Sequence, residues 1–308
     1  MTVFLELKAQ AEQGKVTEQF YVGLAYYDGI GVSQDFEKAE QWLRKSAQHG
    51  NVDAQYKLGN IFSNGAGVIT DHAEATSWFL KAAEQGHIEA QFFLGFSFFE
   101  GIHVEQNNNE ALKWFHKAAL QGYPTAQAFY GLMHRDGRGV PQDYAEALKW
   151  FRKASRQGVP RAAYFLGFMY YNGWGVPLDH ANAAKWFLKA ARQNMKDAQN
   201  NLGRMYVLGE GVTQDIAEAA KWFRKAAEQD HTDAQYFLGV MYRDGEGLVQ
   251  NISQAASWLT KAAEMGHAEA QYDLGLLYED GEGSISNAID WFTKAASQGH
   301  AAAPCQLG

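Results

Sequence analysis

The chain has 308 residues, of which 46% are hydrophobic and 14% aromatic, so it has enough apolar material to fold along its whole length. Its formal net charge is -8 and it contains no run of lysines or arginines, which argues against binding to nucleic acid or to an anionic membrane. The single cysteine, Cys305, excludes an intramolecular disulfide and a zinc site built from cysteines.

A repeat of 36 residues runs through the chain. The tryptophans that mark it are Trp42, Trp78, Trp114, Trp150, Trp186, Trp222 and Trp258, and Trp291 follows after 33 residues. The glycines that mark it are Gly23, Gly59, Gly95, Gly131, Gly167, Gly203, Gly239 and Gly275, and Gly308 again follows after 33 residues. This periodicity predicts eight nearly complete repeats in tandem.

The second repeat shows what each one contains. Its first apolar stripe has the spacing i, i+4, i+7, i+8 and consists of Ala54, Leu58, Ile61 and Phe62. Its second has the spacing i, i+3, i+4, i+7 and consists of Ala75, Trp78, Phe79 and Ala82. Each stripe predicts one amphipathic helix, which we name helix A and helix B, with a glycine-containing loop at residues 64–68 between them.

The ends of the helices are also predicted. Asp71 precedes helix B as an N-cap, and the same position in other repeats holds Asp35, Asn107, Asp143, Asp179, Asp215 and Asn251. After helix B stand Gly50, Gly86, Gly122, Gly158, Asn194, Asp230, Gly266 and Gly299, which predict a left-handed backbone at all eight positions. Gly59 lies inside helix A at a cost of about 1 kcal/mol, and we expect a close backbone approach of helices A and B there.

The motif of the second repeat resembles the Sel1-like repeat. The matching residues are Asp53-Ala54-Gln55, Leu58-Gly59, Asn64-Gly65-Ala66-Gly67-Val68, Asp71, Ala75, Trp78 and Lys81-Ala82-Ala83. The resemblance implies an all-α, right-handed α/α superhelical solenoid related to tetratricopeptide repeats. It also implies a non-catalytic adaptor in assembly, signalling or, in bacteria, contact with host proteins. A cysteine-rich branch of the family is associated with β-lactam binding, but its paired cysteines do not occur here.

We predict one solenoid domain over residues 1–308. Its parts are a capping helix with a polar outer face at 1–14, repeats at 15–50, 51–86, 87–122, 123–158, 159–194, 195–230, 231–266 and 267–299, and a partial repeat at 300–308. The eighth repeat lacks three residues before Ala288, which leaves Ser284 at the cap spacing. In the partial repeat, Ala302, Ala303 and Leu307 are expected to cover the face of the eighth repeat.

The sequence contains no recognisable catalytic, metal-binding or phosphate-binding motif. The chain contains no His-Glu-x-x-His pair, no Gly-x-Ser-x-Gly elbow and no Walker-type loop, so no catalytic residue, metal or cofactor is expected. His87, His231, His267 and His300 recur at one position, at least one repeat apart, which does not favour a shared metal. No basic-then-apolar leader and no long apolar segment occurs, so we expect a cytoplasmic protein; secretion by a route without a leader is also compatible with the sequence.

Ligand preference is expected on helix A, because that helix lines the concave face in tetratricopeptide-like superhelices. The candidate protein-binding residues are Phe92, Phe96, Phe99, Ala128, Leu132, Arg135, Tyr164, Phe168, Tyr171, Arg204 and Arg243. The small Ala128 between Phe92 and Tyr164 predicts a pocket, and the arginines suit an acidic group on the ligand. Under a second interpretation these aromatic side chains only pack successive A helices together.

Three functions remain for test. The favoured one is a scaffold that binds a protein or peptide and is itself monomeric. The alternative is a β-lactam-interacting hydrolase, suggested by distant family analogy, although the sequence offers no nucleophile and base pair. The third is a structural self-assembler whose solenoid ends stack.

Overall fold

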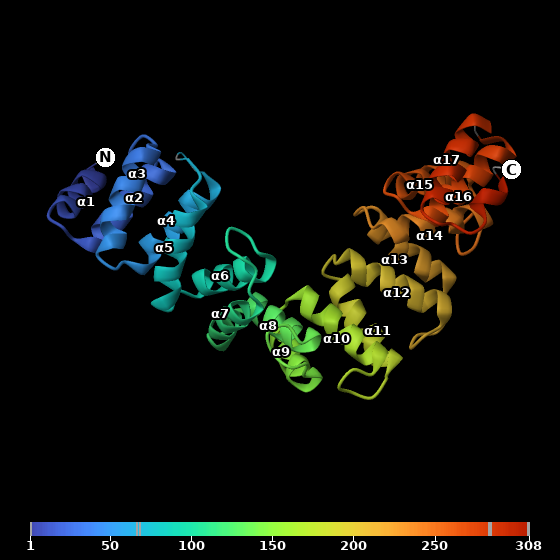
Figure 1. The fold of residues 1–308 in the computed structure, drawn as a ribbon, viewed down its shortest axis with the longest axis horizontal. Helices are drawn as coiled ribbons and strands as arrows, with labels where there is room; N and C mark the ends of the chain where they lie inside the picture. The colour runs from blue at the N-terminus through green and yellow to red at the C-terminus, as the bar shows by residue number, and fades with distance from the viewer. Residues whose placement is uncertain (1, 66, 68, 283–284, 307–308) are drawn as a thin grey trace. The chain divides into compact units, whose positions relative to one another are not determined.

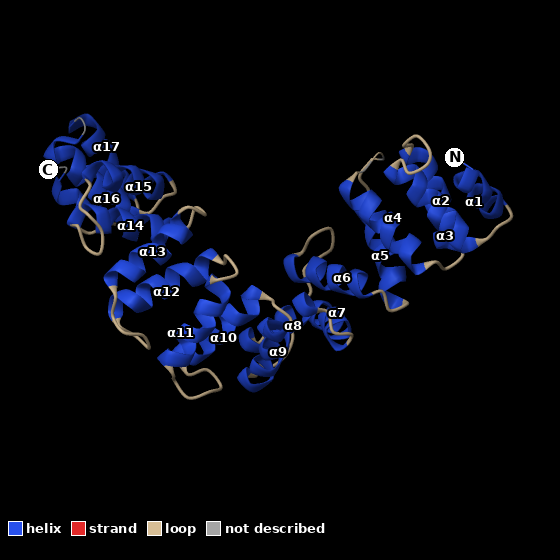
Figure 2. Ribbon diagram, turned by 180° about the vertical axis from the view of Figure 1, so that it is seen from behind, coloured by secondary structure: helices blue, strands red, loops and turns tan. Residues whose placement is uncertain are grey.

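The computed structural model describes residues 2–65, 67, 69–282 and 285–306, and within these ranges all regular elements are helices (Figure 1 and Figure 2). The chain forms two compact halves, residues 1–157 and 158–308. The first half contains α1 (Thr2–Glu12), α2 (Val16–Asp28), α3 (Phe36–Gln48), α4 (Val52–Asn64), α5 (His72–Glu84), α6 (Ile88–Glu100), α7 (Asn108–Leu120), α8 (Pro124–Asp136) and α9 (Tyr144–Arg156).

The second half contains α10 (Pro160–Asn172), α11 (His180–Ala191), α12 (Lys196–Leu208), α13 (Ile216–Ala227), α14 (Thr232–Asp244), α15 (Ile252–Glu264), α16 (Ala268–Leu277) and α17 (Ile285–Ser297). A π-helical turn, Tyr278–Glu282, follows α16, and a 3-10 helix, Ala303–Gln306, follows α17. In each half, every helix packs on the next along the chain, so each repeat is one helix A and one helix B. The predicted all-α solenoid of tandem helix pairs is confirmed; its right-handed sense and its continuity as one domain stay predictions.

The predicted helix caps are confirmed wherever the structure describes them. Asp71 Oδ1 accepts a hydrogen bond from the backbone N–H of Glu74 at 2.9 Å, which satisfies one of the unpaired donors at the start of α5. The same type of bond starts helix B at Asp35, Asn107, Asp143, Asp179, Asp215 and Asn251. Ser284, predicted for this role in the eighth repeat, lies outside the described residues.

The left-handed positions after helix B are confirmed at all eight sites, where φ ranges from 56° at Asp230 to 95° at Gly86. Asn194 and Asp230 take the place of glycine in two repeats, in agreement with the tolerance of these side chains for positive φ. Each repeat therefore ends with the same reversal of the chain, which keeps successive helix pairs in register.

The core lies between helix A and helix B of each repeat. All eight residues of the two stripes in the second repeat are buried, with Phe79 at 0% and Trp78 at 5% exposure. Lys81, outside the stripe, places its ammonium 4.0 Å from the centre of the Trp78 ring, and a lysine lies over the tryptophan in the other seven repeats too.

The glycine inside helix A makes room chiefly for a side chain of helix B, and the expected backbone approach is found beside it at Gly23, Gly131 and Gly239, where an added Cβ would lie 3.1 to 3.3 Å from a backbone atom of helix B. A Cβ added to Gly59 would lie 2.6 Å from the ring of Phe79, which packs flat on the glycine from helix B. The rings of Phe115, Phe187 and Phe223 occupy the same place against Gly95, Gly167 and Gly203. The glycine is thus required because it makes room for a large buried side chain, which is a phenylalanine in six repeats and a leucine, Leu43 or Leu259, in the first and seventh.

A second repeated feature is a buried glutamine in helix A. Gln55 Nε2 donates to the carbonyl of Ala47, and Gln55 Oε1 accepts a 2.7 Å hydrogen bond from Gln85 Nε2. Four more pairs repeat the second bond: Gln91 with Gln121, Gln127 with Gln157, Gln199 with Gln229, and Gln271 with Gln298. Each glutamine therefore joins the start of its helix A to the ends of two B helices, the one before it and the one after it in the chain.

Both ends of the chain differ from the prediction. In α1, Val3 and Leu5 are 78% and 59% exposed, so the outer face expected to be polar carries apolar side chains. After α17 the described residues form a short 3-10 helix instead of a restarted helix A. Ala303 is fully buried there and Ala302 is half-buried, whereas Leu307 lies outside the described residues.

Candidate functional site

In the first half, the predicted binding residues are largely engaged in packing. The centre of the Phe92 ring lies 5.9 Å from that of Phe115 and 5.0 Å from that of Tyr123, and Phe96 packs edge-on against Phe129. Phe92, Phe96 and Leu132 are half-buried and belong to one apolar cluster. On α6 and α8, the packing interpretation describes the aromatic residues better than the binding one.

Two of the predicted residues are buried instead of facing a groove. Phe99 is 6% exposed and Ala128 is 2% exposed. The reason is Phe129, whose ring packs on Phe99, Phe92 and Phe115 at centroid distances of 5.1 to 5.9 Å. The space expected beside the small Ala128 is therefore taken by its own neighbour in the chain.

The three predicted arginines differ in their partners. Arg135 Nε lies 2.6 Å from Asp136 Oδ1, and Arg243 pairs with Asp244 and with Asp273 at 2.8 Å each. The pKa of Asp244 is lowered mainly by its hydrogen bond from Arg243. Arg204 is exposed and, among the described residues, forms no hydrogen bond or ion pair. It is the predicted arginine best placed to meet a ligand.

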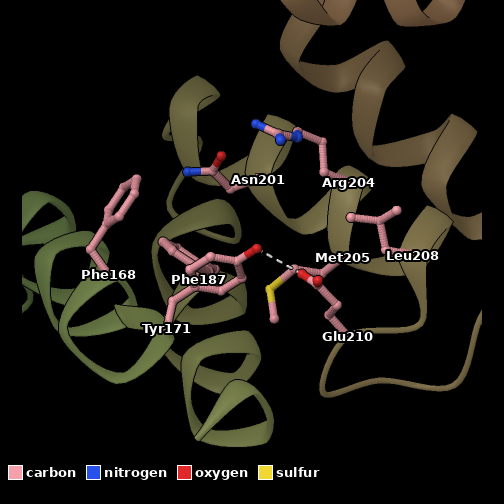
Figure 3. A pocket seen from close by; sticks show the side chains of 8 residues that line it. All are labelled: Phe168, Tyr171, Phe187, Asn201, Arg204, Met205, Leu208 and Glu210. Atoms are coloured by element: carbon pink, nitrogen blue, oxygen red, sulfur yellow. Dashed lines mark hydrogen bonds between the residues drawn. The ribbon is translucent and has the colours of Figure 1, made fainter. Parts of the chain in front are cut away.

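A cavity of about 140 Å³ lies beside Arg204 in the second half (Figure 3). Three predicted residues line it: Phe168 and Tyr171 from α10, and Arg204 from α12. The other lining residues are Phe187, Asn201, Met205, Leu208 and Glu210, which the sequence did not single out. The remaining predicted residue of α10, Tyr164, is half-buried and packs edge-on against Phe168 with ring centres 4.9 Å apart.

The cavity has two chemically different ends. Figure 3 shows Asn201 and Arg204 projecting from α12 on one side, and Tyr171 and Glu210 meeting on the other. Tyr171 Oη donates a 2.7 Å hydrogen bond to Glu210 Oε2, and this bond raises the pKa of Tyr171. One end therefore offers a guanidinium and an amide, and the other offers a carboxylate already engaged by a phenol.

A second cavity, of about 220 Å³, adjoins the first. It is lined by Arg204, Val207, Leu208, Phe223 and Phe237, so Arg204 and Leu208 form a wall common to both cavities. Phe223 and Phe237 stack with ring centres 5.0 Å apart and give this cavity an apolar floor. We name the two cavities together the α12 site; its residues come from α10 to α14, all within the second half.

A larger groove, of about 440 Å³, lies in the first half, near the N-terminus. It is lined by apolar residues of α1 and α2 and the loop that follows, including Val3, Tyr21 and Ile30. Asp28 is the charged residue of its lining, and the rest of the lining is apolar except for the Tyr21 hydroxyl. The groove therefore offers little to fix the orientation of a ligand, whereas specific sites combine apolar walls with a few placed polar groups. We take the α12 site as the stronger candidate.

Within the described part of the chain, no group of three histidine, cysteine or acidic residues is placed to share a metal ion. No helix described here has both the length and the apolar character to cross a membrane.

Comparison with known proteins identifies the repeat. The Sel1 repeat model matches residues 19–51, 52–87, 88–123, 124–159, 160–195, 196–231, 232–267 and 268–300. The comparison with curated proteins gave no match. Among solved structures, a protective antigen present in uropathogenic Escherichia coli strains, displaying an SLR fold, is 37% identical with a TM-score of 0.88. That similarity covers 99% of this chain and 66% of the antigen, so this chain spans about two thirds of its length.

A Sel1 repeat protein from Oxalobacter formigenes is 35% identical, with a TM-score of 0.81, and the similarity covers 99% of this chain and 90% of that protein. The matched segments take in nearly all the helix pairs described above. With eight matched repeats and two similar structures over almost its whole length, the chain belongs to the Sel1 repeat family.

Proposed function

We propose that this protein is a non-catalytic scaffold that holds a segment of a partner protein at the α12 site. Sel1 repeat proteins generally mediate protein–protein interactions. The observation that carries the more specific proposal is the pair of adjoining cavities beside Arg204 and Leu208, of which Leu208 is 57% exposed. The exposed leucine lies beside aromatic rings and beside Arg204, which forms no hydrogen bond or ion pair with the residues that the structure describes, and this is the composition of a protein-binding hot spot.

The size of the cavities supports binding of side chains over binding of a whole small molecule. At about 140 and 220 Å³, each lies below the roughly 300 to 1,000 Å³ of ordinary small-molecule sites. Each volume suits one or two side chains of an extended segment that crosses the A helices. The titratable groups in the lining are Tyr171, Arg204 and Glu210. The hydrogen bond to Glu210 raises the pKa of Tyr171, which keeps the phenol protonated and disfavours it as the nucleophile of a hydrolase.

The proposal is tested by selecting short random peptides on the immobilised protein and measuring their affinity in solution. The enriched peptides are titrated against the wild type and against Leu208→Ser with Phe237→Ala, which removes apolar surface from the α12 site. The matched control is Tyr21→Ala with Ile30→Ser, which removes apolar surface from the α1 and α2 groove. Circular dichroism and thermal unfolding confirm that both variants are folded.

We expect the selected peptides to lose affinity for the α12 variant and to keep it for the control. Loss of affinity for the control alone would move the binding site to the groove of α1 and α2. Equal affinity for all three proteins, or no enriched peptide, would contradict the proposed function.

A further inference from the structure

The sixth repeat, residues 195–230, departs from its neighbours at the last residue of helix A. The equivalent residues elsewhere are polar or acidic, and six of them end helix A: Asp28, Asn64, Glu100, Asp136, Asn172 and Asp244. In the eighth repeat the equivalent residue, Asp280, lies in the π-helical turn after α16. In the fourth and seventh repeats this carboxylate neutralises the arginine that precedes it, Arg135 or Arg243. The sixth repeat has Leu208 at this position and Val207 at the position of Arg135 and Arg243, so this adjacent pair is absent there. Arg204 lies four residues before Leu208, and Leu208 supplies no carboxylate to it.

Arg204 does not stand alone. Asn201 lies one helical turn before it on α12, so both side chains project from the same face, as Figure 3 shows. No hydrogen bond is found for the Asn201 amide within the described residues, although it lines the same cavity. Together they present a positive charge and an amide N–H donor to whatever enters, which is the donor set that a carboxylate accepts best.

The apolar half of the site lies on the far side of Arg204. Val207, Phe223 and Phe237 line the cavity there, and Leu208 forms the wall next to Arg204. A large aliphatic or aromatic side chain placed in this cavity would cover Leu208 and be withdrawn from water. This burial would stabilise the complex by about 25 cal/mol for each Å² of apolar surface removed from water. The positive and the apolar features are adjacent because Arg204 and Leu208 are four residues apart on one helix.

We propose, resting on the function proposed above, that the α12 site recognises a protein segment in which an acidic side chain lies next to a large apolar one. The carboxylate binds the Arg204 guanidinium and the Asn201 amide. The apolar side chain enters the cavity formed by Val207, Phe223 and Phe237. Neither step involves a covalent change.

Glu210 provides the competing possibility, a basic ligand. Its carboxylate is half-buried and already accepts the Tyr171 hydroxyl, whereas Arg204 is exposed and has no such partner among the described residues. The two charges lie at opposite ends of the cavity in Figure 3, so the acid on the ligand can meet Arg204 away from Glu210. The structure therefore favours an acidic over a basic segment.

The test uses the peptide that binds most tightly in the selection described above. It is synthesised in three forms that differ at one position, with glutamate, glutamine or lysine beside the apolar residue. Each labelled form is titrated by fluorescence polarisation against the wild type, Arg204→Ala and Leu208→Asp, which restores an acid within reach of Arg204. The control is Arg161→Ala, because Arg161 is an exposed arginine of α10 outside both cavity linings and its loss changes the net charge equally.

We expect glutamine in place of glutamate to weaken binding to the wild type by about tenfold, the equivalent of one charge-assisted contact. Arg204→Ala should weaken the glutamate form by a similar factor and leave the glutamine form unchanged, which is the signature of a direct pair. Leu208→Asp should weaken the glutamate form more than the glutamine form, and Arg161→Ala should change neither.

Three results would overturn the proposed ligand class while leaving the binding function standing. They are selected peptides that lack an acidic residue, equal binding of the glutamate and glutamine forms, and tighter binding of the lysine form. A loss on Arg204→Ala that is the same for both forms also refutes the pair, because it would show a general role of the side chain. Peptides that bind independently of the α12 site refute the function and the ligand class together.

Discussion

The glutamine pairs allow a prediction of increased stability from one substitution. In the seventh repeat, residues 231–266, Gln235 Nε2 donates to the carbonyl of Ala227 at 3.2 Å, as in the other repeats. Its Oε1 is buried without a hydrogen-bond partner among the described residues, because the position that holds glutamine elsewhere is Met265. Met265→Gln should supply the missing donor.

The backbone is already suitable for the new side chain. Met265 has φ -81° and ψ 6°, and Gln85, which makes the bond in the second repeat, has φ -83° and ψ 3°. Met265 is 64% exposed, so little apolar burial is lost when it is replaced. A net hydrogen bond contributes about 1 kcal/mol, and a buried polar atom left unpaired costs about 1 to 3 kcal/mol. We therefore expect Met265→Gln to stabilise α14 and α15 by about 1 kcal/mol.

The assay must report on this repeat, because the stability of a repeat protein is shared between neighbours and is not a single two-state quantity. Hydrogen exchange of the α14 amides, read by mass spectrometry, gives the local free energy of opening. The reverse substitution, Gln85→Met, should destabilise the second repeat to a similar extent.

The decisive control is Met265→Gln in a Gln235→Leu background, where no glutamine oxygen is left to accept the bond. The gain should disappear there. If slower exchange persists in that background, the effect comes from helix propensity or solvation, and the reasoning from pairing is refuted. No change in either background would refute it as well.

Three further predictions concern the packing and the caps. Gly59→Ala should destabilise the second repeat by about 1 to 3 kcal/mol in a thermal melt, despite alanine's better helix propensity, because the added Cβ meets Phe79 at 2.6 Å; a stabilised variant would contradict this. Asp143→Ala should cost about 1 kcal/mol by urea unfolding, whereas Asp143→Asn should be nearly neutral. The His231 ring accepts a hydrogen bond from the backbone N–H of Ala234, and burial lowers the pKa of His231 below 6.5. The contribution of His231 to the stability of α14 should therefore be full above pH 6.5 and fall as the pH drops below that value. His231→Asn should abolish this fall, so that the free energy of opening of α14, measured by hydrogen exchange, no longer depends on pH.

Most of the fold could be predicted because each repeat is specified by local sequence. The cap at Asp71 and the left-handed position at Asp230 depend on residues a few positions apart, and both are present as expected. For Gly59 the sequence predicted a close approach of helices A and B but not the side chain that makes the contact. That side chain, Phe79, lies 20 positions later, and the orientation of the Phe79 ring is not encoded in the spacing of the repeat. The glutamine pairs were not predicted at all, although glutamine recurs at both positions in the sequence.

The candidate site was harder to predict because it depends on side-chain partners across neighbouring repeats. Phe96 and Phe168 occupy equivalent positions in helix A, yet Phe96 packs edge-on against Phe129 whereas Phe168 lines a cavity. The pocket expected beside Ala128 is absent because the next residue, Phe129, packs its ring on Phe92 and fills that space. Spacing alone does not distinguish these outcomes, since it fixes the direction of a side chain but not what its neighbours leave open.

A better rule for this family compares each position across the repeats and looks for departures in residue chemistry. The core positions must repeat because successive helix pairs bury the same faces, so those positions carry no information about a ligand. At the last residue of helix A, by contrast, seven repeats have a polar or acidic residue and one has Leu208. An exposed leucine there gains nothing from folding, and the adjacent arginine–carboxylate pair of the fourth and seventh repeats is absent, because Val207 stands at the position of Arg135 and Arg243. An exposed apolar side chain at a position that is polar or acidic in the other seven repeats is best explained by contact with another molecule. The same comparison can be applied to any Sel1 repeat sequence before its structure is known.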